Sequence, residues 1–164
     1  MRQDWLPCIQ VTVCLLLLAP AGMTRARGEG SSGADSAATQ TRKIVAVPDP
    51  EQEQAARKAA SAWVQIVDRR RPAESREAAG MFFKKSLLRQ EWERILEQIR
   101  YPMGKMEKRT FDSATIYENH PDFPSERVAF VRYQTQFKNK PDARETVALQ
   151  LEDGSWKVAG YVIE

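Results

Sequence analysis

The sequence has 164 residues, and its 25 lysines and arginines against 22 aspartates and glutamates give a net charge of +3. This near balance argues against a dedicated nucleic-acid-binding protein, which carries a strong basic excess. A hydrophobic fraction of 42% argues against a disordered chain, and two cysteines with one histidine argue against a Cys/His metal cluster. No glycine-rich phosphate-loop motif occurs either, so no cofactor is expected.

Residues 1–21 have the features of a signal peptide. A short cationic start precedes an apolar run that ends in Leu15–Leu18, and Ala19-Pro20-Ala21 fits an A-x-A cleavage site. A transmembrane anchor is the main alternative, but the run is shorter than the roughly 20 apolar residues of a spanning helix. A lipoprotein is disfavoured because Cys14 lies inside the apolar run. We therefore expect export, to the periplasm or the medium, and an exported chain without either cysteine.

Residues 22–47 are predicted to be a flexible linker. Gly, Ser, Ala, Thr and Arg dominate residues 22–43, with no helical or strand period. The short apolar run Ile44–Val47 either belongs to the linker or adds an edge strand, and the sequence leaves this open. The folded domain is predicted to span residues 48–164.

Three helices are expected at the start of the domain. Asp49 is a good N-cap and Pro50 suits the first turn of a helix that ends before Pro72. A short second helix is predicted over 73–79. Phe82 and Phe83 are assigned to the core. Ser86 is the predicted cap of a third helix, which is expected to end at Tyr101–Gly104. The apolar stripes of the first and third helices are Ala56, Ala59, Ala60, Trp63, Val64 and Val67, and Leu87, Leu88, Trp92, Ile95, Leu96 and Ile99.

Four strands follow. They are predicted over 108–118, 127–137, 144–151 and 155–163, and Asp153-Gly154 is the expected two-residue turn of the last hairpin. Regular pairing from that turn places Leu151 opposite Trp156, Val147 opposite Gly160 and Glu145 opposite Val162. This register buries the apolar set and leaves Tyr161 on the half-polar face. The fold class is therefore α+β, with three N-terminal helices packed on a curved four-stranded antiparallel sheet, a cone-like roll.

Several motifs together resemble domain of unknown function 4019, a bacterial and usually exported family. They are Trp63 with Val67-Asp68, Tyr101-Pro102-Met103-Gly104, Lys108-Arg109, Tyr133-x-Thr135-x-Phe137, Glu145-Thr146-Val147 and Asp153-Gly154-x-Trp156-Lys157-Val158-x-Gly160-Tyr161. The resemblance covers about residues 52–164 and implies a fold similar to the nuclear transport factor 2-like, cystatin-like superfamily, whose cone can hold a ligand. Arg69-Arg70-Arg71-Pro72 departs from the small turn usual at that place in the family.

Candidate site residues are few. A cone-shaped pocket with an Asp general base and Tyr donors, as in ketosteroid isomerase, points to Asp112, Tyr117, Tyr133 and Tyr161. The favoured interpretation of Asp112 is a solvent-exposed carboxylate, and that of the tyrosines is packing. Trp63 is likewise interpreted as core, and His120, although close to Asp122, as a surface or capping histidine. Trp63, Asp112, Tyr133 and Tyr161 are the pocket candidates, with no catalytic or metal-ligating residue assigned.

The function expected from the sequence is a non-catalytic exported domain that binds a protein partner or a small apolar ligand in or on the cone. The alternative is a small exported enzyme, isomerase- or hydrolase-like, that uses an Asp/Tyr pocket. A weaker hypothesis is contact with an anionic membrane through Arg69–Arg71, Lys84 and Lys85. A homodimer through the half-polar sheet face is also considered, by analogy alone.

Overall fold

The structure is a computed structural model that describes residues 44–164. The predicted signal peptide and residues 22–43 of the predicted linker lie outside the described residues. The elements, in chain order, are β1 (Val45–Val47), α2 (Pro50–Asp68), α3 (Pro72–Ala78), α4 (Met81–Ser86), α5 (Arg89–Ile95), the π-helical turn η1 (Leu96–Arg100), the 3-10 turn η2 (Tyr101–Met103), β2 (Met106–Glu118), β3 (Arg127–Phe137), β4 (Lys140–Glu152) and β5 (Ser155–Ile163).

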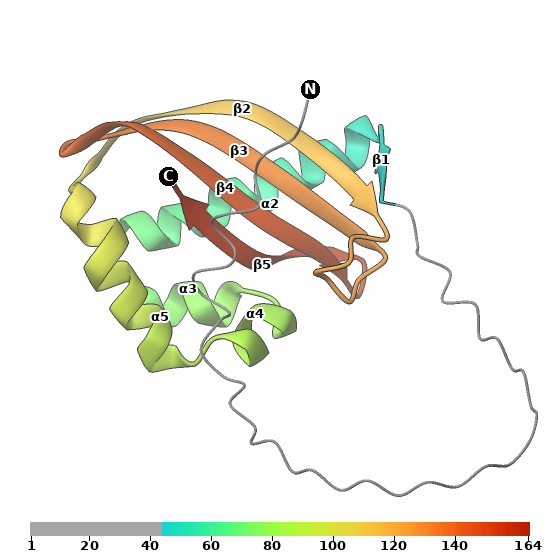
Figure 1. Ribbon diagram of the computed structural model, residues 1–164, viewed down its shortest axis with the longest axis horizontal. Helices are drawn as coiled ribbons and strands as arrows, with labels where there is room; N and C mark the ends of the chain where they lie inside the picture. The colour runs from blue at the N-terminus through green and yellow to red at the C-terminus, as the bar shows by residue number, and fades with distance from the viewer. Residues whose placement is uncertain (1–43) are drawn as a thin grey trace, which may run out of the picture. The chain divides into compact units, whose positions relative to one another are not determined.

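The strands form one antiparallel sheet in which every strand lies beside its neighbour in sequence, in the order β1-β2-β3-β4-β5. In Figure 1 the long strands β2, β3 and β4 arch over α2, and the short helices α3, α4 and α5 lie below the edge strand β5. The α+β prediction is confirmed. The expected number of four strands is corrected to five, because residues 45–47 pair with the end of β2, Val45 opposite Glu118.

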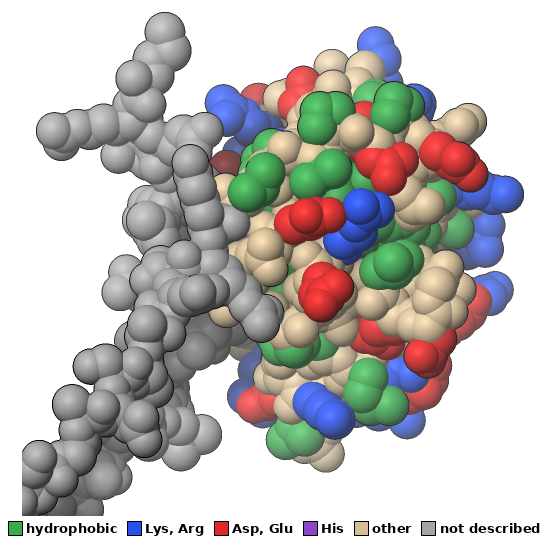
Figure 2. All heavy atoms as spheres, turned by 90° about the vertical axis from the view of Figure 1, so that its right-hand side faces the viewer, with side chains coloured by type: hydrophobic (Ala, Val, Ile, Leu, Met, Phe, Trp, Pro, Cys, Tyr) green, Lys and Arg blue, Asp and Glu red, His purple; other side chains and the backbone are tan. Residues whose placement is uncertain are grey.

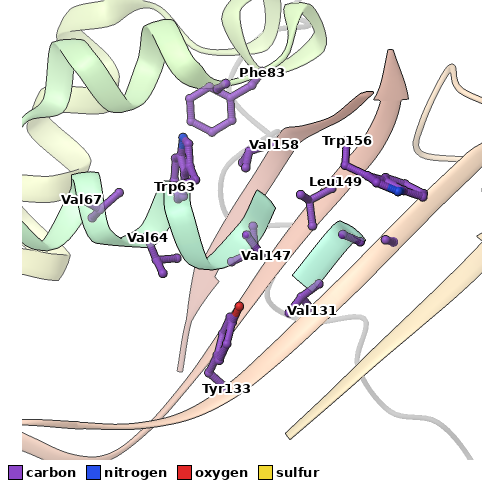
Figure 3. Packing of buried hydrophobic residues seen from close by; sticks show 14 of the residues in the cluster. Trp63, Val64, Val67, Phe83, Val131, Tyr133, Val147, Leu149, Trp156 and Val158 are labelled. Atoms are coloured by element: carbon purple, nitrogen blue, oxygen red, sulfur yellow. The ribbon is translucent and has the colours of Figure 1, made fainter. Parts of the chain in front are cut away.

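Helix α2 begins as its sequence predicts. The Asp49 carboxylate accepts a hydrogen bond of 3.1 Å from the Gln52 amide, and Pro50 occupies the first turn. The predicted stripe is buried against the sheet, with Trp63, Val64 and Val67 each 3% exposed or less. Figure 3 shows these side chains of α2 close to Val147, Leu149 and Val131 of the strands, with Phe83 of α4 above Trp63.

The predicted third helix is wrong in its start and in part of its buried face. Ser86 does not cap it but ends α4, a helix that was not predicted. The cap is Leu88, whose amide donates to the Glu91 carboxylate at 2.8 Å, and its side chain is 64% exposed. After Leu96 the helix winds as a π turn, and Ile99 is 49% exposed while Arg100 is buried. The wider π turn explains this, since an α-helical period would bury residue 99 instead.

The last hairpin follows its predicted register only near the turn. Asp153 and Gly154 both have positive φ, as a type I′ turn requires, and Leu151 pairs with Trp156 as expected. Beyond Val158 the pairing shifts by one residue, so that Val147 lies opposite Tyr161 rather than Gly160. A bulge inverts the faces of the residues after it. Tyr161 therefore contacts the helix-facing core, and its prediction on the half-polar face is wrong.

A second, smaller cluster covers part of the other sheet face. The loop after β2 folds back so that Phe123 and His120 pack on Phe130, with ring centroids 5.9 and 5.3 Å away. His120 is 7% exposed and lies among aromatic rings, so its assignment to the surface is wrong. The sequence shows only its proline-marked loop, not that this loop covers the sheet.

This burial predicts a pH-dependent stability. Burial lowers the pKa of His120 below 6.5, although the Asp122 carboxylate raises it in part. A lowered pKa means that the unfolded chain binds the proton more tightly. The free energy of unfolding is therefore fully retained above about pH 6.5 and falls as the pH drops from there through the folded-state pKa.

Urea unfolding at pH 7.5, 6.5, 5.5 and 5.0 measures this dependence. His120→Phe keeps an aromatic ring in the cluster, and we expect it to flatten the slope, because the sequence has no other histidine. The carboxylates titrate mainly below this range. Equal slopes for the variant and the parent chain would show that His120 protonation does not oppose folding.

Candidate functional site

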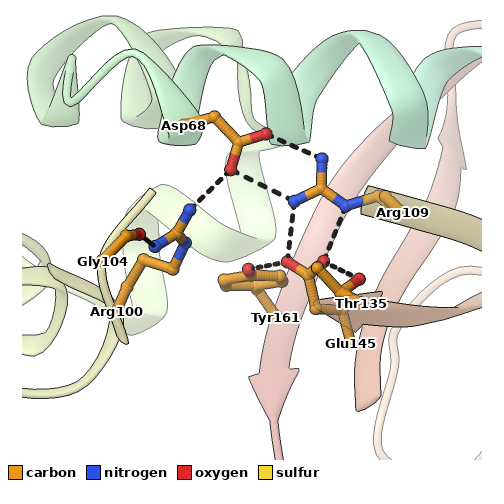
Figure 4. Close-up of polar contacts among 7 residues, drawn as sticks. All are labelled: Asp68, Arg100, Gly104, Arg109, Thr135, Glu145 and Tyr161. Atoms are coloured by element: carbon orange, nitrogen blue, oxygen red, sulfur yellow. Dashed lines mark hydrogen bonds and ion pairs between the residues drawn. The ribbon is translucent and has the colours of Figure 1, made fainter. Parts of the chain in front are cut away.

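A network of charged side chains joins the end of α2 to the sheet, and Figure 4 shows it. Arg109 of β2 lies between two carboxylates. It donates to Asp68, the last residue of α2, at 2.7 and 3.1 Å, and to Glu145 of β4 at 2.6 and 3.1 Å. Both contacts are bidentate, the strongest geometry for a guanidinium and a carboxylate. Arg109 thereby ties α2 to β2 and β4.

Arg100, the last residue of the π turn, extends this network. One guanidinium nitrogen donates to Asp68 at 2.8 Å and another to the Gly104 carbonyl at 2.9 Å. The guanidinium also lies 4.0 Å from the centre of the Phe137 ring. The turn between the helices and β2 is thus fixed to both α2 and β3.

Glu145 is fully buried, and its carboxylate is enclosed by donors. Besides Arg109, it accepts hydrogen bonds from the hydroxyls of Thr135 and Tyr161. Two arginines and two carboxylates make the network neutral. Burial lowers the pKa of Arg109, but its bonds to Asp68 and Glu145 outweigh this and raise it overall. Burial and the adjacent Glu145 raise the pKa of Tyr161 well above 10.0. The Tyr161 phenol and the Arg109 guanidinium therefore keep their protons and do not exchange them with a substrate. We call this network the lock, because it holds α2 to the sheet; its side chains are those of Asp68, Arg100, Arg109, Thr135, Glu145 and Tyr161.

A surface hollow of about 390 Å³ lies directly beside this lock. Its wall is formed by the end of α2, the turn after it, and the segment from Arg100 to the start of β2. The lining residues are Gln65, Val67, Asp68, Arg69, Arg70, Arg100, Tyr101, Gly104, Lys105 and Met106. Four of these are basic and one, Asp68, is acidic. Since Asp68 is already paired with two arginines, the hollow has an excess of positive charge.

Three cations of the hollow lack a carboxylate partner. Among residues 44–164, no Asp or Glu oxygen lies within 4.0 Å of the side-chain nitrogens of Arg69, Arg70 or Lys105. Arg70 instead stacks on the Tyr101 ring, with 4.8 Å from guanidinium carbon to ring centre. Unpaired cations in a concave surface attract anions.

Arg100 and Tyr101, which line the hollow, each have a buried polar atom without a hydrogen-bond partner among residues 44–164, namely Nε of Arg100 and the hydroxyl of Tyr101. Arg100 is 4% exposed, so an unused N–H there is costly. Burial raises the pKa of Tyr101 above 10.0, against the lowering effect of Arg70. The phenol is therefore protonated, and both atoms can donate a hydrogen bond.

The four pocket candidates of the sequence are not brought together in this hollow. Trp63 and Tyr161 do meet, with ring centres 5.3 Å apart, but inside the packed core. Tyr133 is also in the core, 4% exposed, and its hydroxyl has no hydrogen-bond partner among the described residues. Asp112 is exposed at a register shift in β2 and contacts the Ser113 hydroxyl. Burial raises the pKa of Tyr133, so it too stays protonated.

A second hollow lies at the other end of α2, around the loop after β2. It is lined by Glu118, Asn119, Ser125, Glu126, Arg127 and Leu151. Arg127 there is paired with Glu118 at 3.1 Å and with Asp49 at 3.3 Å. Figure 2 shows that basic and acidic side chains lie next to each other on this side of the molecule. Its charges are thus compensated, unlike those of the first hollow.

Residues 44–164 contain no group of three or more His, Cys, Asp or Glu side chains placed to hold a metal ion. Their helices are too short or too polar to cross a lipid bilayer.

Sequence reasoning offered Tyr161 of the lock as a pocket residue, and Arg69 and Arg70 of the hollow as membrane-contact residues. It missed the other residues of the lock and the hollow as site residues. Glu145 did carry a signal, because it shares its strand face with Val147 and Leu149, which are buried. A carboxylate on a buried face requires a buried cation, and that cation is Arg109. Arg100 had no such signal, because the predicted apolar stripe takes Ile99 at that turn and an arginine is rarely buried.

A known protein family matches the part of the chain that forms the lock and the hollow. The family model described as "Protein of unknown function (DUF4019)" matches residues 59–161. This range begins within α2 and includes its second half, the lock, β2, β3, β4 and all of β5 except its last two residues. No curated protein matches the sequence.

Proposed function

Since the chain belongs to the DUF4019 family, whose description assigns no activity, we propose from its own surface that it is an exported, non-catalytic domain that binds a negatively charged ligand in the hollow at the end of α2. The observation that carries this proposal is a set of three cations, Arg69, Arg70 and Lys105, that surround one concavity and have no carboxylate partner within residues 44–164. Elsewhere the second hollow holds an arginine that already has two acidic partners.

The enzyme alternative is less well supported. An Asp/Tyr pocket needs a carboxylate and a phenol facing one cavity. Asp112 is exposed on β2, whereas Tyr133 and Tyr161 are buried in the core. The carboxylate that does contact Tyr161 is Glu145, and Arg109 and Thr135 occupy its remaining acceptor positions. Such a carboxylate is not available as a general base.

The hollow also favours an anion over the apolar ligand that the sequence led us to expect. The core shared by the helices and the sheet is filled by packed side chains, among them Trp63, Phe83 and Trp92 with ring centres 5.2 to 6.1 Å apart. An apolar ligand would have to displace this packed core. An anion in the hollow displaces only solvent around cations that lack partners.

Export remains part of the proposal because of the predicted signal peptide and cleavage site. A protein partner is compatible with it where that partner presents an acidic group. Membrane contact and a homodimer through the outer sheet face also stay predictions, although Tyr161 would not belong to such an interface.

Amide chemical-shift mapping on the full chain tests the proposal. Inorganic phosphate, sulfate and citrate are titrated separately in low-salt buffer, against sodium chloride at equal ionic strength. We expect saturable shifts for at least one of these anions, centred on residues 65–70 and 100–106. Shifts centred elsewhere, or only the shifts that chloride also produces, would overturn the proposal.

A further inference from the structure

We infer that the ligand of this hollow carries a phosphate group, and that Arg70, Arg100 and Tyr101 are the side chains that bind it. This inference rests on the proposed function and specifies its ligand. It follows from three features of the hollow: the number of its donors, the two unused buried donors, and the backbone conformation of Arg70.

The donor set is larger than a carboxylate needs. A carboxylate has two oxygens, whereas a phosphate monoester presents three and carries up to two charges at pH 7. The hollow offers the guanidinium groups of Arg69 and Arg70 and the ammonium of Lys105, which have no carboxylate partner in the part of the chain that the structure describes. Nε of Arg100 and the hydroxyl of Tyr101 add two directional donors. A volume of about 390 Å³ leaves room for an organic group beside the phosphate.

The two unused donors point to a specific ligand rather than to diffuse charge. The other guanidinium nitrogens of Arg100 are held by Asp68 and the Gly104 carbonyl, which fixes the plane of the group. Its Nε therefore has a set direction, and it has no acceptor among the described residues. The Tyr101 ring is held on one face by the stacked guanidinium of Arg70. Buried donors are nearly always satisfied, so an acceptor oxygen bound here would complete the site.

Arg70 adopts a conformation that an arginine avoids. Its φ of 56° is in the left-handed region, where residues other than glycine are strained. Its amide donates to the Val67 carbonyl at 3.0 Å and that of Arg71 to the Ile66 carbonyl at 3.4 Å, so the turn closes the end of α2. Glycine would fit this turn without strain. An arginine here places a cation over Tyr101 at the edge of the hollow, which favours a binding role.

Isothermal calorimetry on the full chain, with inorganic phosphate and pyrophosphate as probes, tests the inference. We expect pyrophosphate to bind, Arg70→Gly to weaken it at least tenfold, and Tyr101→Phe to weaken it about threefold. The midpoint of thermal unfolding of Arg70→Gly should equal or exceed that of the parent, because the strain is relieved. A loss of affinity without a loss of stability distinguishes binding from folding.

Arg71→Gln is the matched control. Arg71 is the next residue, is exposed, and pairs with Glu74 at 3.0 Å outside the hollow. It removes the same charge as Arg70→Gly, and we expect less than a twofold change in affinity. Equal effects of the two variants would show diffuse attraction and overturn the inference. If citrate binds in the hollow and both phosphate probes do not, the inference fails but the proposed function stands. If no anion binds, both fail.

A phosphate group can come from a soluble ester or from a lipid headgroup, and a vesicle arm separates them. Vesicles of phosphatidylcholine with and without phosphatidic acid are sedimented with the chain. Arg70-dependent binding to phosphatidic acid that pyrophosphate displaces identifies the lipid source. Pyrophosphate binding without Arg70-dependent vesicle binding identifies a soluble phosphate ester. Vesicle binding that is equal in the parent and Arg70→Gly chains, with no pyrophosphate binding, would overturn the inference.

Discussion

Replacing Glu145 by alanine is expected to lower the free energy of unfolding by about 3–5 kcal/mol, because it leaves a buried guanidinium with half of its partners. The Arg109 side chain is 9% exposed, and it donates two hydrogen bonds to the Asp68 carboxylate and two to the Glu145 carboxylate. The same substitution removes the acceptor of the Thr135 and Tyr161 hydroxyls. Urea unfolding followed by circular dichroism measures the loss of stability. A variant chain that does not fold would mean that the loss exceeds the stability of the parent chain.

A second variant keeps this prediction testable if the first does not fold. Arg109→Met with Glu145→Leu removes both charges and fills the space with apolar atoms. Asp68 keeps its contact to Arg100 at 2.8 Å in that double variant. Replacing a whole buried pair is often neutral or stabilising, so the double variant should be more stable than Glu145→Ala alone. If Glu145→Ala costs less than about 1 kcal/mol, the network does not lock α2 to the sheet.

The regular parts of the fold are predictable from local rules. Helix α2, with Asp49 as its cap, and the strands β3 and β5 have the bounds that the sequence predicts. In each case one signal dominates, a cap with an amphipathic period or a period of two beside a turn. Local propensity and tertiary packing agree there, and that agreement makes a sequence interpretable.

The lock was not predictable because three irregularities bring its residues together. The register shift at Asp112 inverts the faces of β2, so that Arg109 and Phe111 share the inner face with Ala114. The π turn buries Arg100, and the shift after Val158 turns Tyr161 inward. Each irregularity inserts or displaces one residue, and the hydrophobic period of the sequence does not show at which position this happens.

Bulges and π turns of this kind are common beside functional sites, where they redirect a side chain. Here all three serve the same group of side chains, and two segments of that group, at Asp68 and Arg100, also line the basic hollow. We regard the lock as the rigid support of the hollow. Its charge neutrality means that it consumes none of the positive charge that Arg69, Arg70 and Lys105 present to a ligand.

The second large effect is expected at Trp63, and it decides whether this residue packs or binds. Trp63 is 3% exposed, and its indole N–H donates to the Ser75 carbonyl at 2.7 Å. Its ring contacts those of Phe83, Trp92 and Tyr161. Trp63→Ala should therefore cost about 3–5 kcal/mol in urea unfolding, from lost burial and a cavity.

Trp63→Phe is the informative companion, because it keeps most of the apolar contact and loses the hydrogen bond that holds α3 to α2. We expect an intermediate loss of about 1–3 kcal/mol, since Ser75 is fully buried and its carbonyl would lack this donor. Trp63 does not line the hollow, so the folded Trp63→Phe chain should bind pyrophosphate as the parent does. A chain of unchanged stability but lost affinity would instead place the ligand against the aromatic core between the helices and the sheet, and the basic hollow would lose its role.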